Sequence, residues 1–161
     1  MTAFPVDGFR GARDIAAPRS PILVRLFEYW DGKRAGRLMP SRADIDPAEL
    51  RALVLHVMIY GVVEPGRLYR IRLVGQAIVD FVGANHTGKM AGESMPPDAA
   101  RRMVEILNSV VTRRAPRFRL GSAYWHHDKT HRPFEACFLP LSSDGEAVDK
   151  ILAGSTFTAD R

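Results

Sequence analysis

Residues 69–89 read YRIRLVGQAIVDFVGANHTGK, and this stretch decides how the remaining elements are arranged. Polar and apolar residues alternate at its start, which predicts a sheet-edge strand with one face in water. Gly75 ends that strand, a short apolar helix is predicted over 76–82, and Gly83 suits a helix end in the left-handed conformation. A turn at 87–88 follows. We expect the domain to pack around this strand–helix–turn unit.

Strand and helix patterns lie on both sides of this unit. Residues 56–64 are rich in Val and Ile and are predicted to form a hairpin with the strand at 67–73. Hairpins join neighbouring strands, so the pattern predicts an α+β fold with a five-stranded antiparallel sheet and helices on one face. The predicted helices cover 21–36, 47–53, 76–82 and 97–113, and the predicted strands cover 56–64, 67–73, 117–125, 133–141 and 148–157.

The first 36 residues divide into two parts. Residues 1–20 show no periodicity and several proline and glycine breaks, so we expect a flexible arm. An amphipathic helix is predicted over 21–36, and the remaining domain over 37–161. Because the last two strands are apolar on both faces, this helix is expected to cover the second face, in its own chain or swapped onto a partner. Its stripe is the candidate dimer interface and consists of Ile22, Leu23, Leu26, Phe27 and Trp30.

Composition narrows the class of protein. The chain has 161 residues, of which 46% are hydrophobic and 25% charged, and this suits one globular domain with a terminal extension. No apolar run reaches the roughly 18 residues of a membrane span, and the N-terminus lacks a signal-peptide core, so we expect a cytoplasmic protein. The net charge of +5 is spread over every segment, so specific nucleic-acid binding is not expected. The single cysteine, Cys137, lies in an apolar strand pattern and is predicted to be buried and inert.

No motif for catalysis or for a cofactor stands out. His56 and His86 have the side chain of an axial heme ligand, but their places at a strand start and in a turn favour structural roles. Residues 83–89 lack the preceding strand and the following Ser or Thr of a phosphate-binding loop. The short helix at 76–82 carries no reactive cysteine of the kind used in light sensing. We therefore predict no enzyme activity, no heme or flavin and no metal, and only a polar hairpin loop for the cluster His126, His127, Asp128 and His131.

Six short motifs in a fixed order between residues 22 and 157 point to a family. The order resembles a PAS domain and, more narrowly, a bacterial PAS subfamily found largely in stand-alone chains. The resemblance implies a sheet order of 2-1-5-4-3 and a cavity between sheet and helices. It also implies ligand sensing or protein–protein signalling, often as a homodimer through the N-terminal helix. The motifs are Glu28-Tyr29-Trp30, Ile45-Asp46-Pro47, YRIRLVG at 69–75, Gly83 with Thr87-Gly88, LPLS at 139–142 and Asp144-Gly145.

A sheet with helices across one face leaves a concave apolar space in which a small molecule can bind. The alternative for the same side chains is that they simply fill the core. We expect a non-enzymatic sensory or regulatory module, with a homodimer, an unidentified signalling protein and a small apolar ligand as partners. A small α+β enzyme or carrier using the same cavity, and a basic nucleic-acid binder, are the alternatives. The candidate pocket residues are Met58, Tyr60, Ile71, Phe81, Met103, Leu107 and Phe138.

Overall fold

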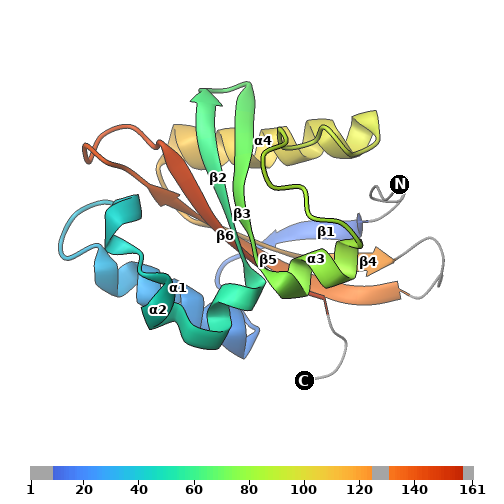
Figure 1. The fold of residues 1–161 in the computed structure, drawn as a ribbon, viewed down its shortest axis with the longest axis horizontal. Helices are drawn as coiled ribbons and strands as arrows, with labels where there is room; N and C mark the ends of the chain where they lie inside the picture. The colour runs from blue at the N-terminus through green and yellow to red at the C-terminus, as the bar shows by residue number, and fades with distance from the viewer. Residues whose placement is uncertain (1–8, 125–130, 158–161) are drawn as a thin grey trace.

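The protein forms one sheet of six antiparallel strands with helices on both faces (Figure 1). The computed structural model describes residues 9–124 and 131–157. The helices are α1 (Pro21–Lys33), α2 (Pro47–Leu50), α3 (Gln76–Val82) and α4 (Pro97–Arg113), with 3-10 turns η1 (Arg42–Asp44) and η2 (Arg51–His56). The strands are β1 (Phe9–Ile15), β2 (Val57–Glu64), β3 (Leu68–Val74), β4 (Arg117–Tyr124), β5 (His131–Leu141) and β6 (Lys150–Thr156).

The predicted topology is confirmed for the five strands β2 to β6. The sheet order is β1-β4-β5-β6-β2-β3, which becomes 2-1-5-4-3 when β2 is counted as the first strand and β1 is left out. Every pairing between neighbours is antiparallel. The α+β fold class is therefore as predicted, with one additional strand. None of the helices in the described ranges is long and apolar enough to cross a membrane.

The additional strand β1 corrects the expectation of a flexible arm for residues 9–15, and residues 1–8 lie outside the described ranges. It pairs with β4 at the edge of the sheet, and the register shifts between Arg10 and Arg13. Such a bulge places an extra residue in one strand and so breaks the alternation of inward and outward side chains. The sequence FRGARDI therefore lacks the period of two by which a strand is predicted.

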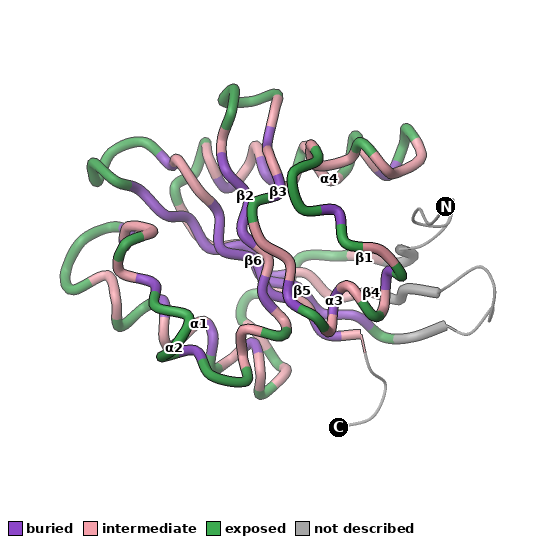
Figure 2. Tube along the Cα trace, in the orientation of Figure 1, coloured by how far each residue is buried: buried purple, intermediate pink, exposed green. Residues whose placement is uncertain are grey.

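Helix α1 covers one face of the sheet within its own chain. It packs on β5 and β6, whereas α4 packs on β5 and β3 from the opposite side. Leu23, Leu26 and Trp30 are at most 2% exposed, and the Trp30 indole nitrogen donates to the Pro140 carbonyl at 2.9 Å. Figure 2 shows the buried residues concentrated in the central strands between these two layers. The second face of the sheet is therefore covered without a partner chain.

Two features of the sheet fix α1 in place. The buried carboxylate of Glu135 on β5 accepts from the backbone amides of Arg19 at 2.6 Å and Ser20 at 2.9 Å, which gives the helix start an acceptor that the Ser20 side chain does not supply. Gly154 on β6 has no side chain where Leu23 and Leu26 approach. A Cβ built on Gly154 would lie 2.9 Å from Leu23 Cδ2 and 2.6 Å from Leu26 Cδ2. The helix and the sheet are in contact at this position.

Replacing Gly154 with valine is expected to lower the free energy of unfolding by about 1–3 kcal/mol, the range for overpacking a filled core. The added side chain would meet the ends of the Leu23 and Leu26 side chains, which are fully buried. Urea unfolding measures the change. The matched control is Gly32→Ala in α1, where an added Cβ meets nothing within 4 Å; it should be at least as stable as the wild type. If Gly154→Val were as stable as the wild type, the tight contact between α1 and β6 would be disproved.

A second prediction concerns Asp14, which holds β1 to β4. Arg117 donates to its carboxylate at 2.9 and 3.0 Å, and Arg119 donates at 2.8 Å. The hydrogen bond from Arg117 is the main cause that lowers the pKa of Asp14 below its ordinary 3.8. A carboxyl group with a lowered folded-state pKa stabilises the fold above its unfolded pKa, and this contribution is lost as the pH falls through the folded value.

Asp14→Asn should therefore speed amide hydrogen exchange in β1 at neutral pH. As the pH falls below 3.8 and through the lower folded-state pKa of Asp14, the exchange of the wild type should approach that of the variant, because the wild type then loses its charged carboxylate. The control is Asp98→Asn, which removes the exposed ion pair with Arg101 on α4 and should leave β1 unchanged. Unchanged exchange in Asp14→Asn would show that the ion pairs do not hold the strand.

Candidate functional site

An interior cavity of about 140 Å³ lies between the sheet and helices α3 and α4. It is on the face opposite α1. Its lining is mostly apolar, and residues on α4 reach it at a helical spacing of three and four. The sheet contributes Met58, Tyr60, Ile71, Ala136, Phe138, Ala153 and Ser155, α4 contributes Ala99, Arg102, Met103 and Ile106, and the connection before α4 contributes Ala84, His86, Ala91, Gly92 and Met95.

Five of the seven candidate pocket residues line this cavity: Met58, Tyr60, Ile71, Met103 and Phe138. Their role in ligand binding stays a prediction. The other two, Phe81 and Leu107, do not line this cavity. Leu107 is fully buried in the close-packed core because the cavity stripe of α4 runs through its neighbour Ile106. Phe81 stacks on Phe157 with ring centroids 3.9 Å apart and borders a separate groove beside the start of α1.

His86 is one of the polar residues in this wall that the sequence did not assign to the cavity. Its side chain is 9% exposed, and its Nε2 atom is buried and makes no hydrogen bond with any residue the structure describes. The Nδ1 atom lies 3.4 Å from the Ser94 hydroxyl. Burial, with a further effect of the Lys89 charge, lowers the pKa of His86 below its ordinary value. The imidazole is therefore neutral at pH 7, with one nitrogen left without a partner.

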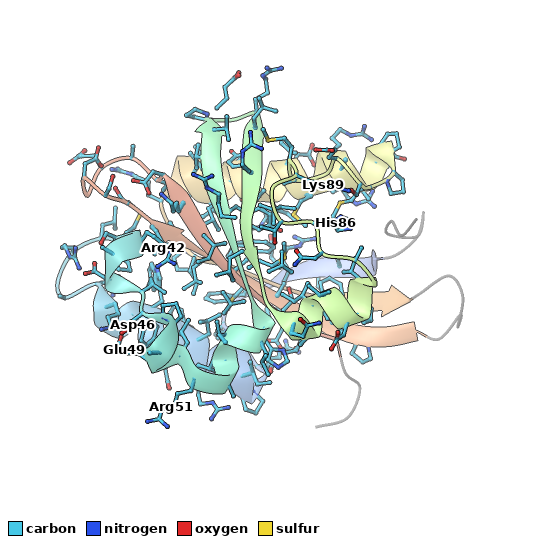
Figure 3. All side chains as sticks on the ribbon, viewed as in Figure 1. Arg42, Asp46, Glu49, Arg51, His86 and Lys89 are labelled. Carbon is cyan, nitrogen blue, oxygen red and sulfur yellow. The ribbon has the colours of Figure 1, made fainter. Side chains whose placement is uncertain are left out.

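The connection that carries His86 is fixed to the edge of the sheet. The backbone amide of Gly88 donates to Ile71 at 2.7 Å, Ile71 donates to Lys89 at 2.8 Å, and Ala91 donates to Tyr69 at 2.7 Å. Gly83 ends α3 with a φ of 92°, a left-handed value that favours glycine. These contacts extend the sheet beyond β3 and hold His86 against the cavity. Figure 3 places His86 and Lys89 on this connection.

Tyr60 supplies a second polar atom. The residue is 4% exposed, and its hydroxyl makes a long contact, 3.8 Å, with the Met58 sulfur. Burial raises the pKa of Tyr60 and keeps the phenol neutral. Its hydroxyl group is therefore available to a bound molecule at the β2 wall.

Two arginines also reach the cavity, from opposite sides. Arg119 on β4 is largely buried and is neutralised by Asp14. Arg102 on α4 is exposed, and its guanidinium pairs with no residue among those described. None of the described lining residues is an aspartate or a glutamate. The polar part of the lining is thus rich in hydrogen-bond donors and positive charge.

The remaining candidates from the sequence include the cluster of histidines at 126–131 and the single cysteine, Cys137. His126, His127 and Asp128 lie outside the described residues, as does the side chain of His131. In the described ranges no group of three or more His, Cys, Asp or Glu could hold a metal ion. Cys137 is fully buried, as predicted, and burial raises the pKa of its thiol to about 12; that the thiol is inert stays a prediction.

The candidate interface stripe on α1 is mostly occupied inside the chain. Leu23, Leu26 and Trp30 are buried, and Phe27 packs edge-on against Phe118 with centroids 5.2 Å apart. Ile22 is partly buried. The buried residues Leu23, Leu26 and Trp30 therefore cover their own sheet. A dimer through this stripe stays a prediction that depends on Ile22 and Phe27.

Figure 3 also labels Arg42, Asp46, Glu49 and Arg51, which lie around α2 beside α1. Glu49 accepts from the Tyr29 hydroxyl at 2.7 Å and pairs with Lys33 at 2.9 Å. The Tyr29 hydroxyl in turn accepts from the Asp46 amide at 2.9 Å. This exposed group ties α2 to α1 and has a structural role.

The chain is similar to several solved structures. The PAS domain of Bordetella pertussis BvgS is 23% identical in sequence and superposes with a TM-score of 0.53, covering 71% of this chain and 87% of its own. The light-state structure of the blue-light photoreceptor Aureochrome1 LOV is 12% identical, with a TM-score of 0.49 and coverage of 71% and 89%. An RNA-binding light-oxygen-voltage receptor is 13% identical, with a TM-score of 0.49 and coverage of 95% and 39%.

At these identities the likeness to solved structures concerns the fold. No curated protein matches the sequence. The sequence model of the PAS domain family matches residues 19–155, which begin just before α1 and end in β6. With the strand order and the motifs already described, this match shows that the chain belongs to the PAS domain family.

Proposed function

We propose that this chain is a non-enzymatic sensory or regulatory module whose contacts with other proteins are controlled by a small molecule in the cavity. One observation carries the proposal: an apolar cavity of about 140 Å³ whose wall contains a buried imidazole nitrogen that has no partner within residues 9–124 and 131–157. Buried polar atoms in folded proteins are nearly always hydrogen-bonded. The size also suits a ligand, since an apolar cavity of about 150 Å³ is known to bind benzene.

The position of His86 supports a regulatory role for such a ligand. The imidazole faces the cavity, while its neighbours Gly88 and Lys89 are exposed and bonded to β3. A molecule bound to His86 therefore contacts a segment that also forms the surface. A homodimer, a signalling partner and a cytoplasmic location remain predictions from the sequence and belong to this proposal.

The alternatives have weaker support. An enzyme needs a nucleophile, acid or base within reach of a second catalytic group, whereas Tyr60 and His86 are separate neutral groups in a mainly apolar lining. Nucleic-acid binding rests on the net charge of +5, which accounts for a salt-sensitive, non-specific attraction only.

The proposal is tested with benzene as a probe of the cavity. Benzene should raise the thermal midpoint of the wild type in a concentration-dependent way, because a ligand bound to the folded state stabilises it by mass action. Ala153→Leu, which fills the cavity from β6, should fold and show a much smaller shift. The control Ala48→Leu, on an exposed position of α2, should respond like the wild type.

Native mass spectrometry of freshly purified protein adds the subunit count and the mass of any retained small molecule. If benzene failed to stabilise the wild type and no small molecule were retained, ligand control through this cavity would be ruled out. If Ala153→Leu responded as strongly as the wild type, the benzene would be bound elsewhere, and the cavity would lose its support.

A further inference from the structure

Among the described residues, the polar groups that line the cavity include positively charged residues but no negatively charged ones, and this difference narrows the chemical class of ligand. The described lining contains two arginines, a histidine, a tyrosine and a serine, and no carboxylate. Hydroxyl groups and the imidazole can donate or accept, but the guanidinium groups only donate. A ligand with a negatively charged, hydrogen-bond-accepting group would satisfy this set, whereas an amine would bring a positive charge toward Arg102 and Arg119.

The two arginines differ in their availability. Arg119 is held by Asp14 at 2.8 Å, with 15% of its side chain exposed. Arg102 lines the cavity from the first half of α4, is exposed, and pairs with no described residue. An acid group near Arg102 would keep part of its hydration, which avoids the large penalty of burying an isolated charge.

His86 adds the buried partner on the same side of the cavity. Its connection packs against α4, since a Cβ on Gly92 would lie 3.0 Å from the Ala100 Cβ. If the Ser94 hydroxyl donates to Nδ1 across 3.4 Å, the ring proton lies on Nε2, the buried nitrogen without a described partner, and Nε2 is then a donor. This tautomer lets His86 donate a hydrogen bond from Nε2 to an acceptor in the cavity that His86 lines.

The geometry points to a small carboxylic acid as the ligand class, with an apolar body of about the size of benzene among Met58, Met103 and Phe138 and its carboxylate between His86 Nε2 and Arg102. This inference rests on the proposed function, because it assumes that the cavity binds a ligand. It goes further by naming the charge of the ligand and the two residues that recognise it.

Calorimetric titration of the full chain with benzoate, benzene and benzylamine tests the inference. Benzoate should bind at least about tenfold more tightly than benzene, as expected for one hydrogen bond to a charged group. Benzylamine should bind more weakly than either. His86→Phe should lose about tenfold in benzoate affinity while keeping benzene binding, and His86→Gln, which retains a donor, should recover part of the loss.

The arginines of α4 provide a matched pair of variants. Arg102→Gln should weaken benzoate binding and leave benzene binding unchanged. Arg101→Gln, one residue earlier, removes the same charge from an exposed side chain that pairs with Asp98 and does not line the cavity; its benzoate affinity should equal that of the wild type. Equal losses in both variants would indicate a general charge effect and overturn the site.

The two proposals fail in different ways. Benzene binding together with benzoate affinity no higher than that of benzene would overturn the acid site and leave the cavity function intact. Tighter binding of benzylamine than of benzoate would also overturn the acid site. The same conclusion would follow from a structure solved with benzoate in which His86 Nε2 is bonded only to a water molecule. Absence of binding by both benzene and benzoate would instead overturn the proposed function.

Discussion

The arrangement of this protein depends on a sheet that is apolar on both faces. Strands β5 and β6 direct Cys137, Leu139 and Leu152 to one face and Phe138 and Ala153 to the other, and all are buried. Burying this much apolar surface is the dominant favourable term in folding. Both faces therefore need a cover, and α1 provides the one that α3 and α4 cannot reach.

The two faces are filled to different degrees, and this difference locates the site. On the α1 face, large side chains such as Leu23, Leu26 and Trp30 meet the sheet where Gly154 leaves room for them. On the other face, small residues of the sheet such as Ala136 and Ala153 line the cavity, which α3, α4 and the connection between them also border. Interiors close-packed with side chains hold few voids. The cavity lies where the short side chains of Ala136 and Ala153 leave space beneath the helices and their connection.

Sequence reasoning predicted the strands β2 to β6 and helices α3 and α4 because their periodicities are regular and their ends carry glycine or proline. It missed β1, where a bulge between Arg10 and Arg13 breaks the alternation. It placed Leu107 in the candidate pocket, whereas its neighbour Ile106 on α4 lines the cavity. One step along a helix turns the side chain by about 100°, and this turn directs Leu107 into the core. His86 was read as a turn residue, since only the fold shows that the 86–91 segment bonds to β3 and turns this imidazole inward.

The same connection links the cavity to the surface. Ile71 lines the cavity with its side chain, and its backbone exchanges hydrogen bonds with Gly88 and Lys89. His86 lies two residues before Gly88, so the group that would meet a ligand and the backbone that extends the sheet belong to one short segment. A ligand shifts a conformational equilibrium only by its difference in affinity for the two states. Here that difference would arise at His86, because the segment can hold the imidazole against the ligand only while it remains bonded to β3.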